Sequence, residues 1–265
     1  MLLLQTANYL GNTKLYYATD NIHVKLITYS RPDFETGSEQ WHAHENTHFT
    51  FFMKGGTVEQ RKQHTYKRTA GEISFYNSGE LHMNSHTLFP SVNLNLEVEA
   101  AFLKKYAVTE SEIQQCTLFN PQSRIALLQL YNELNRDTPN PAFLQMTLLQ
   151  LLLPERNETC NFPAWTKRIR EFLADEWYET PSLEKLSEIA GVHPVTISKH
   201  FNRYFHCTLS EYMRSIKIEK AISLINSTSH SLEEIGFTCG FADKSHFSKV
   251  FREQTGILPG AYRKL

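Results

Sequence analysis

The spacing of apolar residues divides the chain into a strand-rich first hundred residues and a helical remainder. Short runs at 14–19, 22–29, 48–53, 72–77 and 92–99 are rich in aromatic or β-branched residues, and several alternate with polar ones. Such alternation places the apolar side chains on one face of a strand. Gly and Pro recur between the runs, as they do at turns. The pattern predicts an antiparallel β-barrel or sandwich.

Helical spacing begins near residue 100. The segment 123–135 repeats apolar residues every three or four positions. The segment 141–153 starts with Pro141, which suits a first helical turn, and is apolar nearly all round. Such a helix fits either core packing or a helix–helix dimer interface. The segment 154–163 is polar, is bounded by prolines, and is predicted to be a linker.

Together these patterns predict an α+β protein with two domains. We expect an N-terminal antiparallel barrel followed by helices, and a C-terminal all-α domain. The expected division is a barrel at 1–100, a helical dimerisation or packing segment at 101–153, the linker at 154–163, and a helical domain at 164–265.

An internal repeat is the most informative feature of the helical domain. The sequence ISKHF at 197–201 returns as FSKVF at 247–251, and SLE at 182–184 returns at 231–233. Each unit has a first helix, a turn that contains Gly, and a second helix. This order predicts two helix-turn-helix motifs, which the helical period of 210–226 joins through one long helix.

The second helix of each motif, at 194–205 and at 243–254, carries small polar and basic residues on its outer side. The inward positions are predicted to be Ile197, Phe201, Phe247 and Phe251. A helix of this kind fits the major groove of DNA. For one motif alone, the alternative is an all-α interaction domain whose exposed polar residues only face solvent. Two motifs in register favour DNA binding. The predicted DNA contacts are His193, Val195, Thr196, Ser198, Lys199, Asn202, Lys244, Ser245, His246 and Lys249.

Residues 165–265 resemble the DNA-binding domain of the AraC-type (arabinose-regulator) transcription factors, most specifically in CGFADKSHFSKVFREQTGILPGAYRK at 239–264. The resemblance implies contacts to bases or backbone from both second helices, RNA polymerase as a partner, and a cupin-like effector domain at the N-terminus. Asp243 is expected to cap the last of these helices. The sequence departs from the family pattern at four positions. The family usually has a capping Ser at His193, Gly at His206, Ala at Gly236, and Ser or Thr at Leu258.

Histidines concentrate in the strand-rich region, in WHAHENTHFTFF at 41–52. His42 and His44 share one face of a strand, and His48 joins them only if the chain bends at 45–47. NSGELH at 77–82 adds His82 after a Gly turn. The order HxHxxxH…GxxH resembles the metal motif of the cupin barrel, in which the third ligand is more often Glu.

Three interpretations of these four histidines stay open. They could bind a divalent metal such as Zn, Ni, Fe or Cu, line a pocket for an organic effector, or only form hydrogen bonds in a barrel mouth. His86 has the parity to line the same cavity, whereas His64 is expected on an exposed hairpin. No cofactor is certain, and a divalent metal in the barrel is the candidate.

Composition changes this picture little. Formal net charge is −1, and from Ala164 onward the chain has 14 Lys+Arg and 12 Asp+Glu, against 13 and 16 before it. The four cysteines have no CxxC spacing, and the start has no basic region ahead of its leucines. No apolar run is long enough to span a membrane. We therefore expect a cytoplasmic protein.

The predicted function is sequence-specific DNA binding by a transcription regulator whose N-terminal barrel senses a small effector. Its expected partners are double-stranded DNA, the effector, RNA polymerase and a second copy in a homodimer, without a membrane. We expect no enzymatic activity. The alternatives are a cupin-type metal-dependent enzyme fused to a DNA-binding domain, and a helical scaffold that does not bind DNA.

Overall fold

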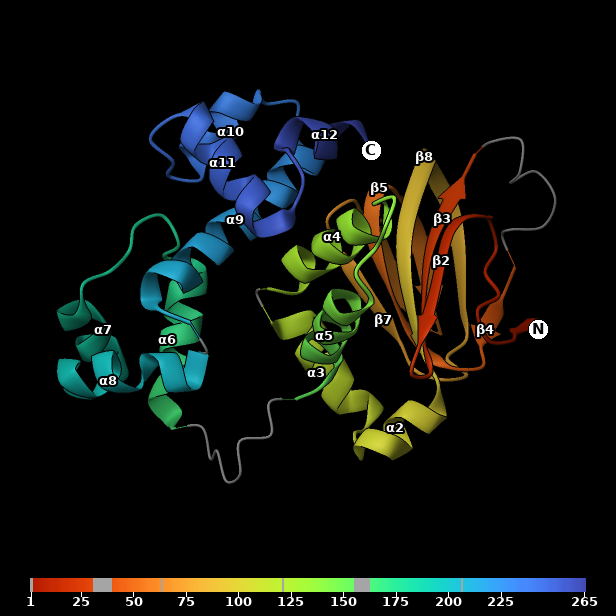
Figure 1. The fold of residues 1–265 in the computed structure, drawn as a ribbon, viewed down its shortest axis with the longest axis horizontal. Coiled ribbons are helices and arrows are strands. Elements are labelled where there is room, and N and C mark those ends of the chain that lie inside the picture. Colours follow the sequence, from red (N-terminus) through yellow and green to blue (C-terminus); the bar gives the residue numbers. More distant parts are fainter. Residues whose placement is uncertain (1, 31–39, 63, 121, 155–162, 206) are drawn as a thin grey trace.

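A computed structural model describes residues 2–30, 40–62, 64–120, 122–154, 163–205 and 207–265 (Figure 1). The N-terminal region forms one curled eight-stranded sheet in this described part of the chain. Its strands are β1 (Leu2–Leu4), β2 (Asn12–Thr19), β3 (Ile22–Tyr29), β4 (His42–His44), β5 (Thr47–Arg61), β6 (His64–Thr69), β7 (Ile73–Tyr76) and β8 (His82–Val98).

The strand order is β1-β4-β8-β3-β2, and β5 pairs with β6, β7 and β8. The pairs are antiparallel except β1 with β4. The predicted antiparallel fold is therefore confirmed, as a curled sheet that also contains this one parallel pair. The two longest strands, β5 and β8, extend well beyond the predicted runs 48–53 and 92–99. Gly55 and Gly56 lie at register shifts inside β5, so they bend the strand and do not end it.

Alternation along β5 places successive side chains in two different environments. Phe49 and Phe51 are 0% exposed and pack in the apolar core with the helices that follow the sheet. His48, Thr50 and Phe52 have the other parity and line a cavity inside the curl. One strand therefore supplies both the core and the wall of a polar site.

Four helices pack against the sheet: α2 (Ala100–Tyr106), α3 (Glu110–Phe119), α4 (Ser123–Leu134) and α5 (Pro141–Leu152). Leu144, Leu148 and Leu151 of α5 are buried in this core. Met146 is 62% exposed and Phe143 is 39% exposed. The nearly apolar helix is thus packed on one side only and leaves its other side exposed.

The C-terminal region is helical in all its described segments: α6 (Ala164–Asp175), α7 (Leu183–Ala190), α8 (Pro194–Phe205), α9 (Leu209–Ser227), α10 (Leu232–Thr238), α11 (Lys244–Thr255) and α12 (Pro259–Lys264). Figure 1 shows α6–α8 at one end of α9 and α10–α12 at the other. Most of the predicted linker, 155–162, lies outside the described residues. Among the described helices, none is long and apolar enough to cross a membrane.

The two ends of α9 belong to different apolar cores. The helices α6–α8 and the first half of α9 share a core that includes Ile197 and Phe201. The helices α10–α12 and the second half of α9, which includes Ile222, belong to one continuous core with the curled sheet and α2–α5. The two helix-turn-helix units are therefore supported differently.

Candidate functional site

Local capping signals set the start of each helix that carries predicted DNA contacts. Asp243 caps α11, because its carboxylate accepts a hydrogen bond from the amide of His246 at 2.7 Å, which confirms the predicted cap. At α8, the ring Nδ1 of His193 accepts a hydrogen bond from the amide of Val195 at 3.3 Å. His193 thus takes over part of the role of the Ser expected there by resemblance. Gly191 at φ 68° supplies the left-handed turn before it.

Both helices bury one side and present the other to solvent. Ile197 and Phe247 are 0% exposed, and Phe201 and Phe251 are buried as well, as the sequence predicted. On the opposite side, the predicted contacts His193, Val195, Ser198, Lys199, Asn202, Lys244, Ser245, His246 and Lys249 are exposed, and Thr196 is half-buried. The polar side of each helix is open to a large ligand.

The other three departures from the family pattern are at Gly236, Leu258 and His206. A Cβ on Gly236 would lie 3.1 Å from the Cβ of Phe247, so Gly at this position lets α10 approach α11 closely despite its cost in helix propensity. Leu258 precedes α12 without a side-chain cap and is 48% exposed. His206 lies outside the described residues.

The four predicted histidines converge on the cavity inside the sheet. The chain bends between β4 and β5, which brings His48 beside His44, with ring centroids 4.0 Å apart. One ligand atom from each of His42, His44 and His82 lies within 4.8 Å of the others. His48 is outside that group of three, although its ring stacks on Tyr76 at 4.4 Å.

Backbone carbonyls orient two of these rings. His42 Nδ1 lies 3.0 Å from the carbonyl oxygen of Gln40, and His82 Nδ1 lies 2.9 Å from that of Glu80. Because a carbonyl only accepts, each Nδ1 carries the proton and each Nε2 keeps its lone pair. A hydrogen bond from the ring nitrogen that does not bind the metal is typical of metal-ligating histidines. The residues present therefore fit a divalent metal held by His42, His44 and His82.

Burial keeps these imidazoles neutral. It lowers the pKa of His44 to about 3 and that of His82 to about 4, with smaller contributions from neighbouring histidines. Burial also lowers the pKa of His42 and of His48. A neutral imidazole can bind a metal or accept a hydrogen bond from a ligand.

The cavity is small and polar, with a volume of about 50 Å³. At about 10–15 Å³ for each water molecule, this is room for a few waters, a hydrated ion or a small organic molecule. His44 Nδ1, Asn84 Oδ1 and Asn95 Nδ2 are buried without a hydrogen-bond partner in the described part of the chain. Buried polar atoms are rarely left unpaired, so these three point to a ligand.

Sequence reasoning missed much of this cavity. Tyr76 lines it, and so do Tyr9, Asn84, Asn93 and Asn95. Asn93 and Asn95 alternate with Leu94 and Leu96, whose side chains are 0% exposed. Polar residues that alternate with apolar ones in a long strand were therefore the signal available in the sequence. Alternation alone does not tell whether the polar face is an outer face or, as here, lines a cavity.

The structure also tests the predicted positions of His64 and His86. His64 is exposed on β6, as expected. His86 is exposed and is absent from the described lining of the cavity, so its predicted place there is wrong. It has φ 50° at an irregular stretch of β8, where Val58 pairs with Ser85 and Gly56 with Leu88. This bulge breaks the alternation on which the prediction rested.

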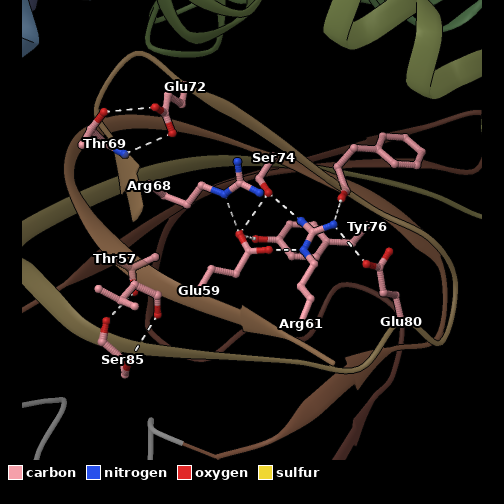
Figure 2. A network of polar contacts seen from close by, with 12 residues as sticks. Thr57, Glu59, Arg61, Arg68, Thr69, Glu72, Ser74, Tyr76, Glu80 and Ser85 are labelled. Atoms are coloured by element: carbon pink, nitrogen blue, oxygen red, sulfur yellow. Dashed lines mark hydrogen bonds and ion pairs between the residues drawn. The ribbon is translucent and has the colours of Figure 1, made fainter. Parts of the chain in front are cut away.

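A buried ion-pair network supports the wall of the cavity (Figure 2). Glu59 is 0% exposed and accepts hydrogen bonds from Arg68 Nε at 2.9 Å and from the Tyr76 hydroxyl at 3.1 Å. It also pairs with Arg61, whose guanidinium lies 4.2 Å from the centre of the Tyr76 ring. Burial opposes ionisation of Glu59, but the two arginines hold its pKa below the ordinary value. The network fixes Tyr76 against the histidines.

Comparison with known proteins adds an independent result. The family model described as "Helix-turn-helix domain" matches residues 186–265. The HTH-type transcriptional activator RhaS of Enterobacter sp. (strain 638) is 23% identical over an alignment of 246 residues, which covers 83% of this chain and 86% of RhaS. A solved transcriptional regulator from Chromobacterium violaceum, with an AraC-type DNA-binding domain, is 25% identical, covers 38% of this chain and 89% of its own, and has a TM-score of 0.36.

A second solved structure, ToxT from Vibrio cholerae, is 13% identical, covers 92% of this chain and 98% of its own, and has a TM-score of 0.38. The match to RhaS covers 83% of this chain, so it includes residues outside the helix-turn-helix region. By its paired helix-turn-helix motifs and these sequence matches, the chain is similar to the AraC-type DNA-binding transcription regulators, and its residues 186–265 match the helix-turn-helix domain family.

Proposed function

We propose that α8 and α11 enter successive major grooves of one DNA duplex. The two helices lie at opposite ends of α9, which has 19 residues. At about 1.5 Å per residue the helix is about 28 Å long, comparable with the ~34 Å of one turn of DNA. The observation that carries this function is the pair of solvent-facing recognition helices held apart by one stiff helix.

Duplexes selected from a random-sequence library by the full chain would provide the DNA for the test. Lys249 is 74% exposed, and its pair with Glu253 at 3.9 Å is weak. Lys249→Ala should weaken binding to every selected duplex and reduce the slope of log K against log salt by about one. Fluorescence anisotropy across a salt series measures both quantities.

Lys104→Ala is the matched control, because it removes the same charge from an exposed position on α2. It should leave affinity and slope unchanged. His44→Ala, in the cavity, should also leave basal DNA binding intact. Failure to enrich any duplex would refute DNA recognition, and equal losses from Lys249→Ala and His44→Ala would contradict separate DNA and sensor sites.

For the sensor, we propose that the histidine cavity binds a small effector and thereby alters DNA binding or transcription. Its unpaired polar atoms and neutral rings support a ligand that both donates and accepts hydrogen bonds. A divalent metal is the second candidate, which the group His42, His44 and His82 favours. RNA polymerase is proposed as a partner from the family alone.

We propose that the exposed side of α5 forms a homodimer interface with a second copy. Met146 and Phe143 form an apolar side opposite the buried leucines. Met146→Glu should convert a dimer to a monomer at micromolar concentration, because a carboxylate would be buried in the interface. Sedimentation velocity measures the mass. Gln145→Glu, exposed on another side of the helix, is the control, and a monomeric wild-type protein would overturn the proposal.

A further inference from the structure

Three side chains of the curled sheet, Tyr16, His23 and Glu99, form a continuous hydrogen-bonded row. The Tyr16 hydroxyl lies 2.8 Å from Nδ1 of His23. On the other side of the ring, Nε2 of His23 lies 2.5 Å from a carboxylate oxygen of Glu99. None of the three is among the described residues that line the histidine cavity. The row is therefore a separate cluster, and the proposed sensing and DNA binding do not use its chemistry.

The register of the sheet brings these residues together from three elements. Ala18 on β2 pairs with His23 on β3, and Tyr16 is two positions before Ala18, so Tyr16 and His23 are diagonal neighbours on one face. Their rings lie nearly parallel, with centroids 6.0 Å apart and planes at 7°. Glu99 directly follows β8, and its amide donates to the carbonyl of Asn21 at 3.0 Å, between β2 and β3. This bond holds Glu99 beside His23.

The chemistry of the three groups sets the direction of the hydrogen bonds. Because a carboxylate oxygen only accepts, Nε2 of His23 carries a proton and donates to Glu99. In the neutral imidazole, Nδ1 then keeps its lone pair and accepts from the Tyr16 hydroxyl. In this order of hydroxyl, imidazole and carboxylate, a histidine can remove the proton of a nucleophile while a carboxylate orients the ring.

Tyr16 is the accessible end of the row. It lies on β2, the last strand in the sheet order, and is 54% exposed. The side chains of His23 and Glu99 are 14% and 31% exposed. Lys25 Nζ lies 5.0 Å from the centre of the Tyr16 ring, where a cation is attracted by the ring and more strongly by a phenolate. A reagent from solvent therefore reaches Tyr16, and the neighbours of Tyr16 favour loss of its proton.

We propose that Tyr16 is a nucleophile that accepts an acyl group from a small activated ester, such as an acyl phosphate or an aryl ester. The Tyr16 oxygen forms a bond to the carbonyl carbon, and its proton moves to Nδ1 of His23. The bond from that carbon to the leaving oxygen breaks, and the leaving group departs as an anion with the electron pair. Glu99 pairs with the imidazolium, which then releases the proton to water. The product is a tyrosine ester on the curled sheet.

Acetylation of the full chain by p-nitrophenyl acetate tests the proposal. Peptide mass spectrometry over time measures the rate at each tyrosine, and hydroxylamine distinguishes the tyrosine ester, which it cleaves, from lysine amides. Tyr178 is the matched control, because it is 58% exposed and its ring stacks on Trp177 instead of lying beside a histidine. Tyr16 should be acetylated at least about 100-fold faster than Tyr178, as is typical of general-base assistance.

Three variants identify the role of each member of the row. Tyr16→Phe should lose the hydroxylamine-sensitive label from its peptide. His23→Gln should lower the rate at Tyr16 to that of Tyr178, because the base is removed. Glu99→Gln should give an intermediate rate, because the amide oxygen still accepts from His23 but carries no charge to pair with the imidazolium. The rate at Tyr178 should be the same in all three variants.

Two results would overturn the proposal. Equal rates at Tyr16 and Tyr178 in the wild type would show that the row only stabilises the sheet. An unchanged rate at Tyr16 in His23→Gln would show that the imidazole does not act as a base. Neither result depends on DNA binding or on a ligand in the histidine cavity, so the test is independent of the proposed function.

Discussion

Replacing Phe247 with alanine is expected to lower the free energy of unfolding of the second helix-turn-helix unit by about 3–5 kcal/mol, as is typical for a buried phenylalanine. Phe247 is 0% exposed, and its ring lies 5.3 Å from that of Phe241 and 5.7 Å from that of Phe251. The cavity left behind would remove the contact that seats α10 on α11. DNA binding should be lost together with the fixed position of α11.

Chemical denaturation monitored by amide exchange over 232–255 measures the stability, and anisotropy with a selected duplex measures binding. Phe237→Ala is the control, because Phe237 is 56% exposed on α10. It should change the free energy of unfolding by no more than about 0.5 kcal/mol. Equal effects from the two variants would mean that α10 and α11 do not pack as described.

The second large effect concerns the histidine cavity. We expect zinc to bind the wild-type protein with one ion per chain, and His82→Ala to weaken this binding at least about 100-fold, because losing a ligand costs more than the 10–100-fold typical of an outer-shell partner. His82 is chosen because its Nδ1 proton is held by the Glu80 carbonyl at 2.9 Å, which leaves Nε2 for the metal. Isothermal titration calorimetry measures affinity and stoichiometry.

His64→Ala serves as the control, since His64 is exposed on β6 and is not among the described residues that line the cavity. Its zinc affinity should equal that of the wild type. Substoichiometric zinc binding by the wild type, or equal affinity in His82→Ala, would remove the metal candidate. The small organic effector would then be the remaining candidate ligand, because the unpaired Asn84 and Asn95 atoms point to a ligand whether or not a metal binds.

Local sequence was sufficient for the parts of the protein that depend on neighbours along the chain. The repeat of ISKHF as FSKVF, Asp243 before α11 and the burial of Ile197 and Phe247 follow from helical period and capping, which act within a few residues. The convergence of His42, His44 and His82 was also predictable, from strand parity together with a resemblance to a known metal motif.

Tertiary structure decided what depends on the fold of a whole strand or on two distant segments. Strand alternation indicates that Asn93 and Asn95 share a face, but only the curl of the sheet makes that face the inside of a cavity. The bulge in β8 turned His86 outward. The ion pair of Arg124 with Glu219 joins residues 95 positions apart. No local pattern specifies such a pair, because the two residues meet only where α4 packs against α9.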